Sequence, residues 1–181
     1  MIDRIPIKTN PKMFDLAVSK IQNVLGSITW FDHVFGICEF LTDVKEGKKF
    51  TSANVYVGKN RYEQIMPCEA LGNFAMFVMH DPQTISKQGN RNITSPFSLI
   101  IWYNMNKVSL PLDERNREQI KYQIYKALEG AHFPWLVLNK IYEKPENVFE
   151  GFSYEHTNNQ FLMSPYAGMR IDGEITIVVP C

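Results

Sequence analysis

The sequence lacks an excess of either charge: 19 lysines and arginines balance 19 aspartates and glutamates, so the formal net charge is zero. Proteins that bind nucleic acid or anionic membranes through long-range attraction carry a large positive charge. The clearest cluster of like charge is Lys45, Lys48 and Lys49 around Glu46 and Gly47, which is typical of a solvated turn between two strands. We therefore expect neither sequence-specific nucleic acid nor a membrane among the partners.

Cysteine is also scarce. Cys38, Cys68 and Cys181 are odd in number and far apart, which predicts reduced thiols rather than a disulfide framework or a zinc site. No apolar run approaches the roughly 20 residues that a membrane-spanning helix requires, and the N-terminal MIDRIPIKTN has no signal-peptide core. We expect a soluble protein made in the cytoplasm. The histidines stand singly, without metal-binding spacing, at His33, His80, His132 and His156.

Motifs for cofactors and catalysis are missing too. The glycines never form the phosphate-binding patterns GxGxxG or GxxxxGK[ST], and no GxSxG nucleophile elbow occurs. We expect no cofactor, no metal and no enzymatic activity. One alternative stays open: His80 and Asp81 follow an apolar run, where an imidazole and a carboxylate could serve as acid and base, although Asp81 with Pro82 also favours a plain turn.

Two amphipathic helices are predicted. Apolar side chains recur at steps of three and four residues over 11–25 and again over 113–128, with polar residues between them. Residues suited to cap or end these helices flank both segments. In chain order, the predicted caps and ends are Asn10, Gly26, Asp113 and Gly130.

The remaining pattern is that of β-strands. In the segments FAMFVM and SLIIWYNM, apolar residues occupy both the odd and the even positions. This pattern is typical of strands that are covered on both faces. Consecutive strands flanked by two main helices predict a single α+β domain over residues 1–181, with a mostly antiparallel sheet packed by those helices. The predicted strands are Val34–Thr42, Thr51–Val57, Tyr62–Met66, Phe74–Met79, Phe97–Met105, Trp135–Tyr142 and Met169–Val179.

Two segments are predicted to be exposed. The polar stretch from His80 to Pro96 has no periodicity and is rich in turn-forming residues, which predicts an exposed loop or hairpin arm near residues 81–96. The last strand alternates between apolar and polar residues, which indicates that one of its faces is exposed. Its polar face carries Arg170, Asp172, Glu174 and Thr176.

Several phrases, taken in order, resemble a known class of proteins. They are VYVGKNRYEQIMP, LGNFAMFVMHDPQ, PFSLIIWYNMNKV, the helix DERNREQIKYQIYKAL and the closing SPYAGMRIDGEITI. Together they resemble small structural proteins of tailed phages and prophages of the Bacteroides type, in the neck or tail-terminator class. The resemblance covers most of the chain and lies in element order and aromatic or apolar phrases.

The resemblance implies a structural α+β subunit of the virion neck or tail, assembled in the host bacterial cytoplasm. Such subunits form closed homo-oligomeric rings, often of six copies, that join the tail to the head and contact other neck and tail proteins. A head-to-tail ring needs two different complementary patches on each subunit. As a hypothesis, we assign these patches to the arm and the last strand, at Ser86, Lys87, Gln88, Arg91, Asn92, Arg170, Asp172 and Glu174.

A different class of function also stays open. The chain could be a monomeric α+β module that binds a small ligand. Such a module needs an apolar pocket, which Phe77, Trp102 and Tyr103 could line.

Overall fold

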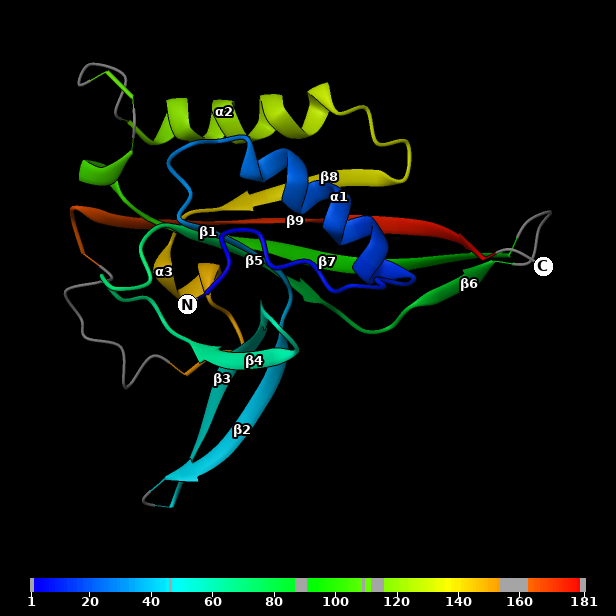
Figure 1. The fold of residues 1–181 in the computed structure, drawn as a ribbon, viewed down its shortest axis with the longest axis horizontal. Coiled ribbons are helices and arrows are strands. Elements are labelled where there is room, and N and C mark those ends of the chain that lie inside the picture. The colour runs from blue at the N-terminus through cyan, green and yellow to red at the C-terminus, as the bar shows by residue number, and fades with distance from the viewer. Residues whose placement is uncertain are drawn as a thin grey trace.

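The computed structural model describes residues 2–45, 47–86, 91–108, 110–111, 116–153 and 163–179. Helices and strands follow one another in the order drawn in Figure 1. The helices are α1 Phe14–Gly26, η1 Met105–Lys107, α2 Arg117–Gly130 and α3 Pro145–Val148. The strands are β1 His33–Ile37, β2 Glu39–Lys45, β3 Lys48–Gly58, β4 Arg61–Ile65, β5 Phe74–Met79, β6 Thr84–Ser86, β7 Arg91–Asn104, β8 Leu136–Tyr142 and β9 Tyr166–Val179.

The strands form two sheets. The larger has the order β1-β5-β7-β9-β8, with β6 added to one end of β7, and the smaller has the order β2-β3-β4. Only the β1–β5 pair is parallel among the described pairings. β7 and β9 are paired along their whole length, from Arg91 opposite Val179 to Asn104 opposite Tyr166. They are the longest described strands and lie within the large sheet.

Each face of the large sheet buries its own apolar cluster. Alternate residues of β5, β7 and β9, such as Phe77, Leu99 and Ile171, pack against α1 and α2. The intervening residues, such as Met76 and Trp102, pack against the small sheet and α3. Figure 1 shows the two main helices on one side of the sheet and β2–β4 on the other. The predicted α+β class, with a mostly antiparallel sheet and two main helices, is confirmed.

Both helices exist, but their predicted starts are wrong. α1 begins at Phe14, after Met13 in a left-handed conformation at φ 50°, so Asn10 does not cap it. In α2, the side chain of Asn116 accepts a hydrogen bond from the backbone N–H of Gln119 at 3.0 Å. Asp113, the predicted cap, lies outside the described residues. The sequence pattern locates the apolar stripe of a helix. It does not fix the first residue of the helix, because several nearby polar residues are able to cap it.

The predicted strands are present, but their ends differ, one of them is divided in two, and β6 was not among them. The predicted strand Val34–Thr42 is two strands, β1 and β2, which belong to different sheets. The lysine cluster lies at the β2–β3 turn, where Gly47 has φ 77°. The stretch from His80 to Pro96, predicted to be an exposed loop or hairpin arm, contains paired strands, because Thr84–Ser86 pairs antiparallel with Asn92–Thr94. Within the described ranges, no helix has both the length and the apolar character required to cross a bilayer.

Cys38 is buried between the two sheets, and its thiol should be unreactive. It is 5% exposed, and burial raises its pKa to about 12. At pH 8 the reactive thiolate would then be roughly one ten-thousandth of the population. In a variant with Cys68→Ser and Cys181→Ser, we expect Cys38 to be labelled at least about 100-fold faster in urea than in buffer. Equal labelling rates, followed with a chromogenic disulfide, would contradict this burial.

Candidate subunit interface

The large sheet extends beyond the helices as a three-stranded ribbon. β5 ends at Met79 opposite Phe97, and β8 begins at Leu136 opposite Ile175, yet β7 and β9 continue as a pair. We call the extension, made of β6, residues 91–96 of β7 and residues 174–179 of β9, the arm. Figure 1 shows it projecting past the ends of α1 and α2.

Four predicted interface residues lie on the described part of the arm, and Glu174 of β9 is one of them. Ser86 ends β6 and is exposed, Arg91 begins β7 and is exposed, and Asn92 is half-buried beside them. The side-chain oxygen of Asn92 is buried without a hydrogen-bond partner in the described structure. Lys87 and Gln88 lie outside the described residues.

The two faces of the arm differ chemically. Ile85, Ile93 and Ile177 are opposite one another on adjacent strands, so their side chains share the face that continues towards the helices. Ile93 and Ile177 pack against the helix-side core, whereas Ile85 is 63% exposed. The other face carries a row of threonines, in which the hydroxyls of Thr94 and Thr176 are 2.8 Å apart. The arm is therefore amphipathic.

The exposure expected for Arg170 is wrong. β9 lies between β7 and β8, and Arg170 is only 7% exposed. Its Nη1 donates to Glu150 Oε2 at 2.7 Å, and its Nε lies 2.9 Å from Asp172 Oδ1. The guanidinium also lies over the Tyr142 ring, 4.5 Å from the centroid. Of the three predicted residues on this strand, Glu174 is exposed, Asp172 is half-buried and Arg170 is buried.

Charge explains why Arg170 can remain buried. Burial lowers the pKa of Arg170, but its hydrogen bond to Glu150 and the charge of Asp172 outweigh this effect and raise that pKa. The hydrogen bond and charge of Arg170 lower the pKa of Glu150 in turn. The contacts of Arg170 with two carboxylates and with the face of an aromatic ring offset the free-energy cost of removing its charge from water.

His80 belongs to the same polar chain. Its Nε2 lies 2.7 Å from Ser98 Oγ, and Ser98 Oγ donates to Asp172 Oδ1 at 2.6 Å. Because the serine proton points to Asp172, the imidazole N–H donates to the serine oxygen, which is the reverse of a nucleophile activated by a base. Ser98 is also 1% exposed. Asp81 is exposed at the turn that begins with the Asp81–Pro82 bond.

The pocket expected from Phe77, Trp102 and Tyr103 does not form. All three side chains are at most 1% exposed. Phe77 and Tyr103 belong to the helix-side cluster, whereas Trp102 belongs to the cluster on the opposite face of the sheet. Burial raises the pKa of the Tyr103 hydroxyl to about 12. These aromatic residues therefore form core on two sides of one sheet.

A groove that the sequence did not predict lies between the end of α2 and the start of β8. It has a volume of about 290 Å³. Glu129 and His132 supply its charged and polar groups, and Phe133 stacks on Trp135 with 4.6 Å between ring centroids. The phrase FPW between a helix and a strand is the only sequence signal for it that we recognise. The lining residues are Leu128, Glu129, His132, Phe133, Pro134, Leu136 and Leu138.

The β2–β3 hairpin is a second projection. Figure 1 shows it extending away from the large sheet, on the side opposite the helices. Among the described strands, its outer strand β2 pairs only with β3, and it exposes Phe40, Leu41 and Val44, the last at 68%. Phe40 stacks on Phe152, with 4.8 Å between ring centroids. Apolar side chains on an open strand edge are typical of segments that contact another chain.

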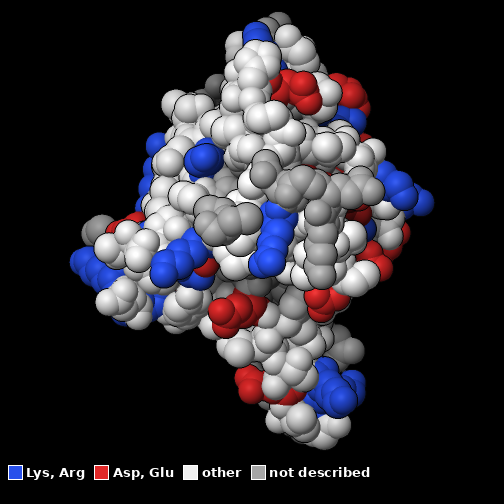
Figure 2. All heavy atoms as spheres, turned by 90° about the vertical axis from the view of Figure 1, so that its right-hand side faces the viewer, with Lys and Arg blue, Asp and Glu red and all other residues white. Residues whose placement is uncertain are grey.

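Charges of both signs are mixed on the surface that carries the arm. Figure 2 shows this end of the molecule, where lysines and arginines alternate with acidic residues over the visible described atoms. Such a surface favours specific pairing with a protein over long-range attraction to nucleic acid. Within the described ranges, histidines, cysteines and carboxylates form no group that could hold a metal ion.

Comparison with known proteins supplied no relative. No protein-family model, no curated protein sequence and no solved structure matches the chain. The functional assignment therefore depends on the surfaces described above and on the resemblance in sequence.

Proposed function

We propose that the chain is a structural assembly protein of a tailed-phage virion, acting as a ring subunit of the neck or tail terminator. The observation that carries the proposal is the pair of β-ribbons, the arm and the β2–β3 hairpin, that project from a densely packed body. Both expose large apolar side chains at their surfaces, including Ile85 at 63% and Val44 at 68%. Exposed apolar side chains on projecting ribbons are suited to contact neighbouring subunits in a ring.

The chemistry of the body agrees with this role. Hydrogen bonds link Arg170 to Glu150 and link Ser98 to both His80 and Asp172, and Ser98 is buried. The proposed partners are other copies of this chain and further neck and tail proteins. The proposed location is the virion, with assembly in the host bacterial cytoplasm.

Negative-stain images of the purified chain, taken over a range of concentrations, test the proposal. We expect closed rings of uniform diameter with a central channel. Images that show only small compact particles at every concentration would count against a subunit that closes rings by itself. A panel of small metabolites that raises the melting temperature would favour the ligand-binding alternative instead.

A further inference from the structure

The arm and the α2–β8 groove are chemically complementary. On the arm, Arg91 is opposite Val179 and shares the helix-side face with Ile85. This face therefore presents exposed apolar groups next to a cation. The groove is lined by Leu128, Leu136 and Leu138 together with polar groups, among them the carboxylate of Glu129.

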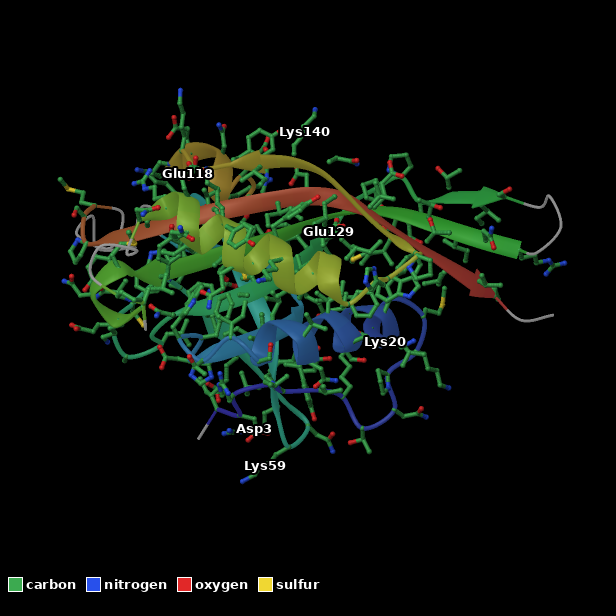
Figure 3. All side chains as sticks on the ribbon, turned by 90° about the horizontal axis from the view of Figure 1, so that it is seen from above. Asp3, Lys20, Lys59, Glu118, Glu129 and Lys140 are labelled. Atoms are coloured by element: carbon green, nitrogen blue, oxygen red, sulfur yellow. The ribbon has the colours of Figure 1, made fainter. Side chains whose placement is uncertain are left out.

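Both charged side chains are exposed. Among the described residues, neither Arg91 nor Glu129 forms an ion pair. Glu129 is exposed on the last turn of α2, and its charge and hydrogen bond raise the pKa of Tyr125 on the preceding turn. Figure 3 shows Glu129 at the end of α2 that is nearer the arm, with the helix and β8 side by side.

The groove also borders an open strand edge. β8 pairs with β9 on one side and with no described strand on the other. An extended segment that enters the groove can therefore add backbone hydrogen bonds to β8 while its side chains contact the leucines and Glu129.

We infer that the arm of one copy docks in the α2–β8 groove of the next copy, with Ile85 among the leucines and Arg91 paired with Glu129. This inference rests on the proposed function and gives the ring its intersubunit contact. The contact joins unlike surfaces, so every copy uses its arm once and its groove once. Repetition closes a ring when the rotation between copies permits it.

Charge reversal tests the contact. Arg91→Glu and Glu129→Arg each place like charges together at the interface, and we expect each variant to assemble at least about tenfold more weakly than the wild type. An equimolar mixture of the two variants restores both attractive pairs, because each chain then finds the complementary charge on its neighbour. We expect the mixture to regain the wild-type mass by light scattering.

Two matched substitutions control for surface charge alone. Glu118→Arg reverses a carboxylate at the other end of α2, and Lys59→Glu reverses a cation at the β3–β4 turn, on the other side of the molecule (Figure 3). We expect both to assemble like the wild type. Recovery on mixing also shows that the two interface variants fold.

The outcomes separate the inference from the proposed function. If the wild type forms rings and both reversal variants form the same rings, the arm–groove contact is overturned and the ring proposal stands. If the wild type forms a dimer that each variant loses and the mixture recovers, the contact is supported and the ring is overturned. If the wild type is monomeric at every concentration, copies of this chain do not bind one another through the arm and the groove, and the inference is overturned.

Discussion

Arg170→Met is expected to destabilise the protein by about 3 kcal/mol, because it removes the buried cation that pairs with half-buried Asp172 and with exposed Glu150. The loss leaves Asp172 half-buried with Ser98 as its remaining donor. It also removes the cation over Tyr142 and so loosens the contact between β8 and β9. Urea unfolding followed by circular dichroism measures the change in the free energy of unfolding.

Two further substitutions make this test specific. Lys140→Met removes an exposed cation from neighbouring β8, and we expect a change of at most about 0.5 kcal/mol. Arg170→Lys keeps the charge but not the forked guanidinium that can bond two carboxylates. We therefore expect a loss of stability between those of Lys140→Met and Arg170→Met. A change in Arg170→Met no larger than that in Lys140→Met would show that the polar chain contributes nothing to the fold.

Gly173→Ala is the second substitution with a large expected effect, again about 3 kcal/mol of destabilisation. A Cβ at Gly173 would overlap the backbone carbonyl oxygen of Val137 and approach the Phe97 ring at 2.9 Å. The carbonyl belongs to the paired strand β8, so it cannot move without breaking the pairing beside the bulge between Leu138 and Lys140.

Gly130→Ala is the matched control. A Cβ at Gly130, the last residue of α2, meets no atom within 4 Å. We expect no loss, and a gain of up to about 1 kcal/mol from the reduced freedom of the unfolded chain. Thermal unfolding of both variants beside the wild type checks the pair. Equal melting temperatures for Gly173→Ala and Gly130→Ala would contradict the close approach of β8 to β9.

The secondary structure could be predicted because it depends on local patterns. The apolar stripe containing Ile120, Ile124 and Leu128 locates α2, and all three are buried. The doubly apolar runs of β5 and β7 indicated burial on both faces, which the two core clusters explain. What covers the second face could not be predicted, because no local pattern shows that β2–β4 folds back as a separate sheet.

The candidate site was predicted only in part, for a related reason. Alternation along β9 correctly places Arg170, Asp172 and Glu174 on one face. It does not tell that Glu150 and Tyr142, distant in sequence, cover Arg170 while Glu174 stays exposed. Likewise, polarity and turn formers indicated the arm, but its pairing with the end of β9 depends on a contact between segments about 80 residues apart.

The native mass of the wild-type chain in solution, measured by light scattering across a concentration series, tests the central claim most directly. The monomer has a mass of 21.0 kDa. Assembly into closed rings predicts a single large species whose mass is a fixed multiple of this value and stays constant as concentration rises. A mass of one chain at every concentration would contradict self-assembly into rings.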